Sequence, residues 1–320
     1  MGFILGLLLF ILVFYYTGGT DLLVVLSGVN ISYILVAFLS QLLVIFLCTL
    51  RLKTILSFLD YNLEFSKVLK ILIAGMGINQ LTPIVRAGGE PVKMYYLSKN
   101  NVPATKSSAS VIIEISSELI SVYATLFLLV IFLSSMKYLA PKYLHICIPL
   151  VAVFAVAFIF IFRFLLKEEN IRKFIRYILR FFKTKKKISS NDFTQSLRTL
   201  FKNRSLQLKI FSMSFLVRFF ELLRIYFLLQ AINYPTIFFL VLSIWVLQYL
   251  FSMVPWLPGG LGLIEGGTIS GLVLLGLPIY ISSSLILLDR VLSFWLPIFL
   301  GFLALYFLKK EFSNQELFKI

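Results

Sequence analysis

Charged side chains inside apolar stretches are the residues of this chain whose types and spacing could do chemistry. Glu114 and Glu118 lie four residues apart, so on a helix they share one face. Arg218, Glu221 and Arg224 follow one another at intervals of three and would form one stripe. Because a charge at membrane depth costs about 2.5–3.5 kcal/mol on insertion scales, these residues should either pair with one another or line a polar path for a charged head group. Both interpretations stay open, and the same residues can serve both.

Two interruptions of the apolar pattern, Ile78–Met94 and Val254–Gly267, each combine a Gly-Gly pair, prolines and a glutamate. Exposed backbone groups survive in a bilayer only inside protein or beside a watery cavity, so we interpret the interruptions as two halves of one site. Helix N-termini at such breaks attract anions, and Arg86 or Lys93 would add a phosphate contact. In the simpler alternative, Gly and Pro merely kink helices that their neighbours repair.

The candidate substrate-binding residues come from these interruptions and from the charged positions of the apolar stretches around them. They are Asn79, Arg86, Gly88, Gly89, Glu90, Lys93, Glu114, Glu118, Arg218, Glu221, Arg224, Gly259, Gly260, Gly262, Glu265, Asp289 and Arg290. We expect Arg218, Glu221 and Arg224 to be partly paired with Glu114 and Glu118. Gly89 and Gly260 are expected to need a left-handed backbone or a close backbone approach.

Enzyme, metal and nucleotide templates fit this sequence poorly. The single histidine, His145, leaves little for a catalytic triad, and neither G-x-S-x-G nor H-E-x-x-H occurs. Cys48 and Cys147 both sit in apolar runs and suggest neither a disulfide framework nor a metal site. The glycine run at Gly259–Gly262 lacks the G-K-[ST] ending of a phosphate-binding loop. We therefore predict no catalytic residue, no metal and no cofactor.

Composition and charge define the class. The chain is 60% hydrophobic with a mean hydropathy of +0.96, which predicts an all-α, polytopic integral membrane protein. The net charge of +16 is concentrated in residues 163–209, which hold fourteen Lys/Arg against three acids. Because this segment lies between apolar spans, we expect a cytoplasmic loop beside anionic inner-leaflet lipids and no nucleic-acid partner.

The elements that must position the candidates are full spans and half-spans. The expected spans are Ile31–Leu50, Ser107–Leu133, Tyr143–Phe162, Ile210–Ile232 and Leu285–Leu308. Phe3–Tyr16 is short and is interrupted at Thr17–Asp21. Basic residues flank Val68–Leu81 on both sides, so this half-span predicts a re-entrant hairpin from the cytoplasm, and Phe238–Leu277 predicts one from the outside.

The expected organisation is one domain, residues 1–320, with a first half 1–162, a basic cytoplasmic loop 163–209 and a second half 210–320. Opposite orientation of the two hairpins is typical of inverted-repeat transporters. Within the loop, Arg172–Lys183 predicts a basic amphipathic helix on the inner leaflet, followed by a solvated linker at Lys185–Asn191.

Five motifs occur in a fixed order along the chain. They are N-x-x-x-P at Asn79/Pro83, G-G-E-P-V-K at Gly88–Lys93, the span with Glu114 and Glu118, P-G-G-L-G-x-x-E-G at Pro258–Gly266, and D-R-x-x-S-F-W-x-P at Asp289–Pro297. In this order they resemble the lysylphosphatidylglycerol synthetase transmembrane (flippase-like) family over essentially the whole chain. The resemblance implies a polytopic helical domain that moves lipids, in bacteria often fused to a soluble aminoacyl-transferase domain. No soluble domain precedes Phe3 and only twelve residues follow Leu308, so we expect the membrane role alone.

The function expected from the sequence is therefore a flippase-like transporter of the cell (cytoplasmic) membrane. It would move a phospholipid or polyprenyl-linked lipid with a charged head group between leaflets. One alternative is a non-transporting subunit that partners a separate glycosyl- or aminoacyl-transferase. Another is a membrane enzyme that uses Glu114 and Glu118 as acid and base on a lipid. In the transporter interpretation, Glu90 and Glu265 approach one cavity, and replacing either with Gln reduces lipid movement while folding stays largely intact.

Overall fold

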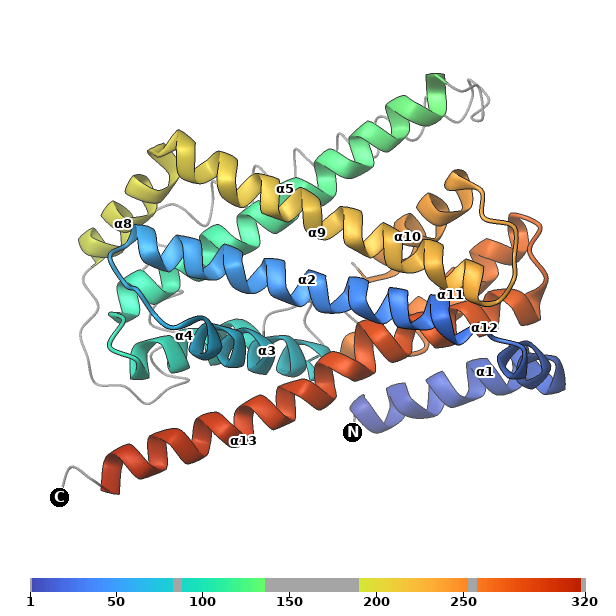
Figure 1. The fold of residues 1–320 in the computed structure, drawn as a ribbon, viewed down its shortest axis with the longest axis horizontal. Coiled ribbons are helices and arrows are strands. Elements are labelled where there is room, and N and C mark those ends of the chain that lie inside the picture. Colours follow the sequence, from blue (N-terminus) through green and yellow to red (C-terminus); the bar gives the residue numbers. More distant parts are fainter. Residues whose placement is uncertain (1, 83–87, 136–189, 253–257, 318–320) are drawn as a thin grey trace. The chain divides into compact units, whose positions relative to one another are not determined.

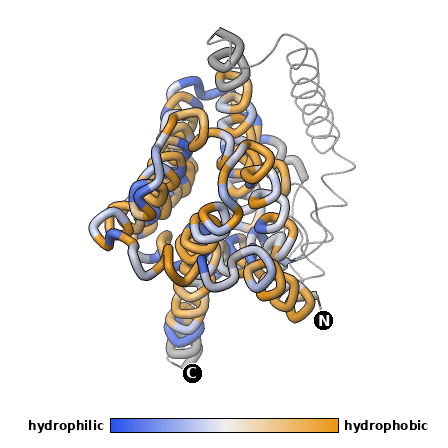
Figure 2. Tube along the Cα trace, turned by 90° about the vertical axis from the view of Figure 1, so that its right-hand side faces the viewer, coloured by the Kyte–Doolittle hydropathy of each residue, from blue (hydrophilic) through white to orange (hydrophobic). Residues whose placement is uncertain are grey.

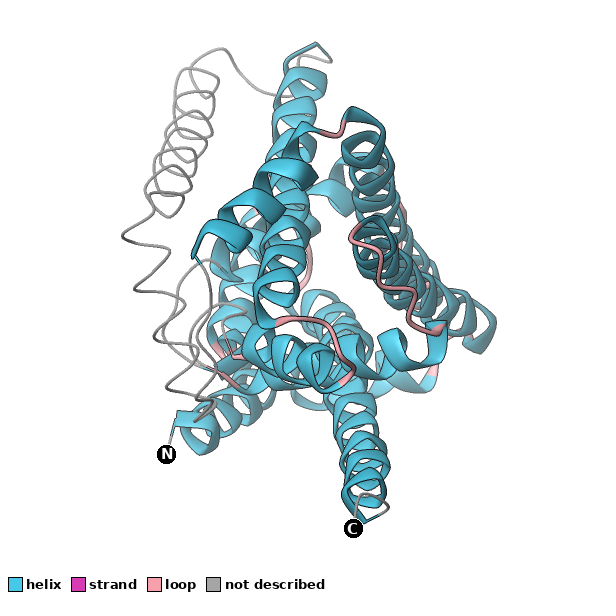
Figure 3. Ribbon diagram, turned by 90° about the vertical axis from the view of Figure 1, so that its left-hand side faces the viewer, coloured by secondary structure: helices cyan, strands magenta, loops and turns pink. Residues whose placement is uncertain are grey.

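The computed structural model describes residues 2–82, 88–135, 190–252 and 258–317, and all regular structure in these ranges is helical (Figure 3). The all-α prediction is confirmed. The helices are α1 (Gly2–Ser27), α2 (Ile31–Phe58), α3 (Phe65–Leu81), α4 (Gly89–Lys99), α5 (Ala104–Ser135), α8 (Ser190–Lys202), α9 (Arg204–Ala231), α10 (Phe238–Ser252), the 3-10 turn η1 (Pro258–Gly260), α11 (Leu263–Leu274), α12 (Ile279–Arg290), the π-helix η2 (Val291–Trp295) and α13 (Leu296–Leu317).

Several helices have the length and composition of membrane spans. Among the described residues, Ile31–Phe58, Ala104–Leu128 and the continuous stretch Ile279–Phe312 meet both requirements. Apolar positions dominate the helical tube in Figure 2. Helix α1 bends by 87° at Gly19, within the predicted interruption, and its two arms together meet the same requirements. The chain is a multi-pass membrane protein.

The predicted element boundaries differ from the structure at charged residues. Helix α2 continues past Leu50 to Phe58, so Arg51 lies within a helix rather than at its end. Helix α8 begins at Ser190, where the sequence predicted the end of a solvated linker. The predicted span Tyr143–Phe162 and the predicted amphipathic helix Arg172–Lys183 lie outside the described residues.

The contacts divide the chain into two compact units that interleave along the sequence. The first unit contains Met1–Thr49, Glu64–Lys93 and Phe219–Ile320, and the second contains Leu50–Leu63 and Met94–Arg218. The first interruption up to Lys93 and the whole second interruption therefore belong to the first unit. The predicted division into halves around the basic loop stays a prediction.

In the first unit, α3 packs antiparallel along α13 (Figure 1). Lys70 Nζ lies 3.3 Å from Glu311 Oε2 near one end of the pair, and Gln80 Nε2 donates to the Ser293 carbonyl (3.4 Å) at the other. Between these points the helices touch at glycines, because a Cβ added to Gly77 would lie 2.8 Å from Gly301 Cα. The end of α3 therefore reaches a point near the middle of the stretch Ile279–Phe312.

Helices α10 and α11 form a second antiparallel pair in the first unit. A Cβ added to Gly267 would contact the Phe251 ring at 2.6 Å, and one added to Gly271 would lie 2.8 Å from Leu247 Cδ1. Leu261, just before α11, packs into a small core with Phe10, Phe294 and Ile298. The open end of this hairpin adjoins the start of α12 at Ile279.

The second unit has its own core, where the ends of four helices meet. Phe193, Leu197 and Leu200 recur at helical spacing on α8 and are buried. They pack against Ile55 of α2 and Ile113 of α5, and against the first turns of α9. Burial of this face explains why a mostly polar sequence forms a helix here.

Candidate functional site

The two interruptions meet within the first unit. Gly259, in η1, lies so close to the last turn of α3 that an added Cβ would be 2.7 Å from the Gln80 carbonyl oxygen. The Gln80 side chain in turn donates to the Ser293 carbonyl of η2. The start of the first interruption (the first break, Ile78–Met94) therefore contacts Gly259 within the second (the second break, Val254–Gly267), beside a π-helix.

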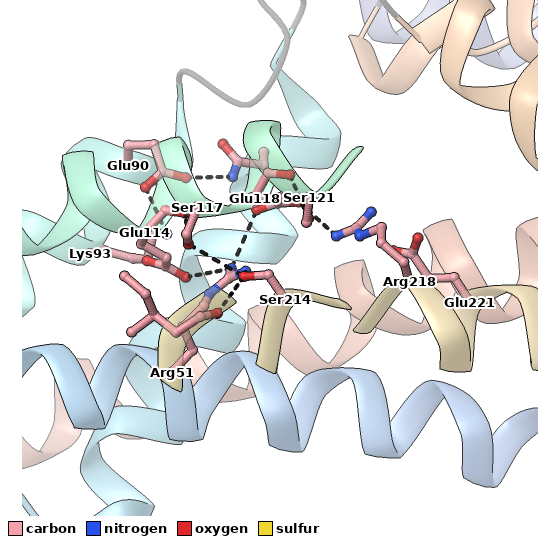
Figure 4. A network of polar contacts seen from close by, with 12 residues as sticks. Arg51, Glu90, Lys93, Glu114, Ser117, Glu118, Ser121, Ser214, Arg218 and Glu221 are labelled. Carbon is pink, nitrogen blue, oxygen red and sulfur yellow. Dashed lines mark hydrogen bonds and ion pairs between the residues drawn. The ribbon is translucent and has the colours of Figure 1, made fainter. Parts of the chain in front are cut away.

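Asn79 ties the two sides of the first break together. Its Oδ1 accepts from the Gly89 N–H (2.7 Å), and its Nδ2 donates to Glu90 Oε1 (3.2 Å). The Glu90 carboxylate lies 2.7 Å from Lys93 Nζ, one turn further on, and both residues are buried (Figure 4). Gly89 is required here because an added Cβ would lie 1.9 Å from the Gly75 carbonyl oxygen.

The Glu265–Arg290 pair holds the second break. Glu265 is completely buried, accepts from the Gly262 N–H (2.6 Å) and receives the Arg290 Nε–H. Arg290 also donates to the Gly259 carbonyl (2.9 Å), and its guanidinium lies 4.7 Å from the centroid of the Phe294 ring. One ion pair thus connects α12, η1 and the first turn of α11.

Three glycines of the second break have left-handed backbones: φ is 59° at Gly259, 65° at Gly260 and 81° at Gly262. Side chains other than glycine are strained in this region, because the Cβ crowds the backbone. The predicted requirement for glycine is confirmed at Gly260 by its φ and at Gly89 by its close backbone approach. In the first break, Gly88 is also restricted, since an added Cβ would lie 2.1 Å from Thr82 Cγ2.

A second buried ion pair lies next to Arg290 in sequence. Asp289 accepts from Arg224 Nε (2.8 Å), Gln248 Nε2 (2.9 Å) and Ser293 Oγ (3.2 Å). Arg224 also donates to Gln41 Oε1. With three donors on one carboxylate, both charges of this pair are well satisfied inside the first unit.

Glu221 accepts hydrogen bonds from two aromatic side chains. It accepts from Trp245 Nε1 (3.0 Å) and from the Tyr249 hydroxyl (3.3 Å), both on α10.

The π-helix Val291–Trp295 directly follows Asp289 and Arg290. Such π-turns are frequently found at functional sites.

The second unit contains a cluster of two arginines and two glutamates (Figure 4). Arg51, only 1% exposed, places Nη2 3.4 Å from Glu114 Oε1 and 3.5 Å from Glu118 Oε2, and its Nη1 donates to Ser214 Oγ (2.9 Å). Arg218 Nη2 lies 3.4 Å from Glu118 Oε1. Glu118 therefore bridges two arginines, and the four charges balance inside the unit.

These contacts show how far the stripe pairs with Glu114 and Glu118. The pair Arg218–Glu118 is confirmed. Arg224 pairs with Asp289, and Glu221 accepts from α10, so the pairing of the stripe with Glu114 and Glu118 is partial, as expected. An α-helix has 3.6 residues per turn, so two residues six positions apart lie on different faces of the helix and contact different neighbouring helices.

Sequence reasoning missed Arg51, because a cation directly after an apolar run is typical of the cytoplasmic end of a span. The apolar pattern resumes at Ile55 and Leu56, both fully buried, and this was the available signal that the helix continues.

Arg86 lies outside the described residues. Within the part of the chain that the structure describes, no group of three or more His, Cys, Asp or Glu could hold a metal ion.

Taken together, the fold and the site define a multi-pass helical membrane protein whose buried charges are paired and whose two helix breaks meet. The chain belongs to the family described as the lysylphosphatidylglycerol synthase TM region, whose model matches residues 1–301. This confirms the resemblance seen in the motifs.

Similar proteins come from several archaea. A UPF0104 membrane protein of Methanocaldococcus jannaschii is 25% identical, with 98% of this chain and 96% of that protein covered. One from Archaeoglobus fulgidus is 27% identical over 99% of both chains, and one from Pyrococcus horikoshii is 25% identical over 93% of both. The chain thus spans nearly the full length of these relatives, which carry no named activity.

Proposed function

We propose that this protein is a flippase-like transporter of the cell membrane, which moves a lipid with a charged head group between leaflets. The observation that carries the proposal is the contact between the two breaks, Gln80 against Gly259, near the middle of the long helical stretch Ile279–Phe312. Interrupted backbone at membrane depth is tolerated where protein or a watery cavity surrounds it. Transporters place substrate sites at such breaks.

The proposal includes two re-entrant hairpins of opposite orientation. Lys67 and Lys70 at the start of α3 lie at the same end as Lys309 and Lys310 of α13, because Lys70 contacts Glu311. An excess of cations favours the cytoplasmic side, so α3 would enter from the cytoplasm. The hairpin of α10 and α11 adjoins the start of α12, at the other end of the stretch Ile279–Phe312, and would enter from outside.

Charged groups near the breaks suit a zwitterionic or anionic lipid head group. In this proposal Glu90 offers a carboxylate and Lys93 an ammonium beside the first break. Their ion pair would open as the head group replaces one partner. In this proposal the protein moves an intact lipid and catalyses no reaction.

Exchange of lipids in liposomes tests the proposal. Purified protein is reconstituted with a panel of labelled phospholipids and polyprenyl-phosphate lipids, and the fraction of label reached by a membrane-impermeant quencher is followed over time. We expect exchange above protein-free liposomes for at least one charged lipid. Glu90→Gln should slow it by about tenfold, because a neutral amide no longer balances a cationic group in the site.

Glu64→Gln is the matched control, since Glu64 is 72% exposed and its i,i+3 contact with Lys67 is long (3.9 Å). It should exchange lipids at the unmodified rate. The transporter proposal is wrong if no lipid of the panel exchanges faster than in protein-free liposomes. Equal slowing of lipid exchange by Glu90→Gln and Glu64→Gln would show that Glu90 is not part of the binding site.

A further inference from the structure

An open pocket lies at the turn between α8 and α9, and it is lined by none of the residues assigned to transport. Its volume is about 320 Å³, and its walls are Phe201, Arg204, Gln207, Leu208 and Phe211. Arg204 and Gln207 make a polar, cationic side, while the two phenylalanines and Leu208 make an apolar one. A pocket of this composition suits an amphipathic molecule with a negative head.

The turn is a fixed structure. Asn203 Oδ1 accepts from the Leu206 N–H (2.8 Å) and caps the start of α9. Gln207 Nε2 donates to the Leu200 carbonyl (2.9 Å) and ties α9 back to α8. The buried side chains of Leu200 and Leu206 anchor both helices in the core of the second unit. The pocket is therefore present before any ligand binds.

The sequence on both sides of this turn is rich in cations, of which Arg204 lines the pocket. Arg198, Lys202, Arg204 and Lys209 are all exposed, and the sequence has no Asp or Glu between residues 193 and 211. Four positive charges between residues 198 and 209 create a local positive potential. The concentration of cations also favours the cytoplasmic side of the membrane, where anionic lipids lie.

The apolar side of the pocket continues along α9. The pocket residue Phe211 packs against Phe215 (ring centroids 4.7 Å apart), and the exposed side chains of Leu208 and Leu216 lie near them along α9. The opposite face, with Ile210 and Ser214, is buried in the second unit. The pocket thus opens where an apolar stripe suited to acyl chains begins.

We infer that this pocket binds the head group of an anionic phospholipid of the inner leaflet. The phosphate lies against Arg204, Lys202 adds to the local positive charge, and an acyl chain follows Leu208 toward Leu216. The apolar wall favours a membrane lipid over a soluble phosphate, because a free anion would leave that wall in water. None of the predicted substrate-binding residues lines the pocket, so the inference is independent of transport.

Native mass spectrometry of the full chain tests this inference. Protein is released from nanodiscs containing equal amounts of phosphatidylglycerol and phosphatidylcholine, and retained lipids are counted. The unmodified protein should retain phosphatidylglycerol preferentially. Lys202→Ala/Arg204→Ala should lower that retention by about tenfold, since each cation near an anionic surface contributes to binding.

The matched control is Lys309→Ala/Lys310→Ala, which removes the same charge from exposed positions of α13 in the other unit. It should retain phosphatidylglycerol as the unmodified protein does. Lys202→Gln/Arg204→Gln is a second variant of the pocket, and gel filtration checks that both pocket variants are folded. Equal losses in the control and pocket variants, or equal retention of both lipids by the unmodified protein, would overturn the inference. Displacement of the lipid by millimolar inorganic phosphate would assign the pocket to a soluble anion and overturn it too.

Discussion

At the residue scale, each glutamate of the two breaks contacts a cation of its own. Glu90 lies against Lys93, and Glu265 lies against Arg290, both within the first unit. Asn79 and Arg290 also hydrogen-bond to backbone groups of the breaks, so the polar residues hold the irregular backbone in place. That Glu90 and Glu265 share one binding site stays a prediction, because the structural ion pair of each glutamate is compatible with binding of a lipid.

Replacement of Glu265 should destabilise the protein far more than the sequence analysis predicted, which expected folding to stay largely intact. Glu265→Gln leaves Arg290 as a buried charge without its carboxylate and should lower the free energy of unfolding by about 3–5 kcal/mol. Thermal unfolding of the purified protein in detergent measures this. Glu265→Gln/Arg290→Met should recover part of the loss, since no lone charge remains. An unfolding temperature for Glu265→Gln equal to that of the unmodified protein would contradict the structural role.

At the element scale, close glycine contacts decide how the half-length helices pack. Gly77 of α3 and Gly301 of α13 allow the two backbones to touch, and Gly75 does the same for Gly89 at the start of α4. Lipid gives little hydrophobic drive for helices to associate, so close packing of backbones supplies much of the attraction. The end of α3 is held against the π-helix by this contact and by Gln80.

Gly301→Ala should separate α3 from α13. Its Cβ would lie 2.7 Å from Gly77 Cα and 3.1 Å from the Ile73 carbonyl oxygen, neither of which is a flexible side chain. We expect a loss of about 1–3 kcal/mol in the free energy of unfolding. Thermal unfolding and protease resistance both report it.

Gly266→Ala provides the comparison. Gly266 lies inside α11, and among the described residues an added Cβ there meets only Val13 Cγ2 of α1, at 3.6 Å, which is an ordinary contact. This variant should be neutral or more stable by up to about 1 kcal/mol, because alanine favours helix. Equal destabilisation by the two substitutions would show that the close contact of Gly77 and Gly301 is not what holds the helices together.

At the scale of the whole molecule, the proposed orientation in the membrane can be measured. Single cysteines at Lys67 and Lys309, in a background without Cys48 and Cys147, should react with an impermeant maleimide only from the cytoplasm. A cysteine at Tyr280, at the start of α12, should react only from outside. The reason is that Lys70 and Glu311 lie together at one end of α3 and α13, while Tyr280 lies at the other end of the continuous helix. Labelling of Lys67 and Lys309 from opposite sides would contradict the re-entrant path of α3.

The sequence alone determined the class of protein, the two breaks and most of the charged residues at issue. Long apolar runs, Gly-Gly pairs and charges at membrane depth are local features with strong physical consequences, so they predict helices, interruptions and buried ion pairs. The Arg218–Glu118 pair and the glycine requirement at Gly89 and Gly260 followed from the same reasoning.

Only the tertiary structure decided which charges meet. Arg51 looked like the end of a span until it was seen between Glu114 and Glu118, and Arg224 found Asp289, 65 residues away. Helix spacing fixes the face of a residue, but the partner depends on which helices pack together. That packing is set by contacts distant in sequence, such as Gly77 on Gly301, and these leave no local signal because a glycine in an apolar helix looks the same whether lipid or another backbone covers it.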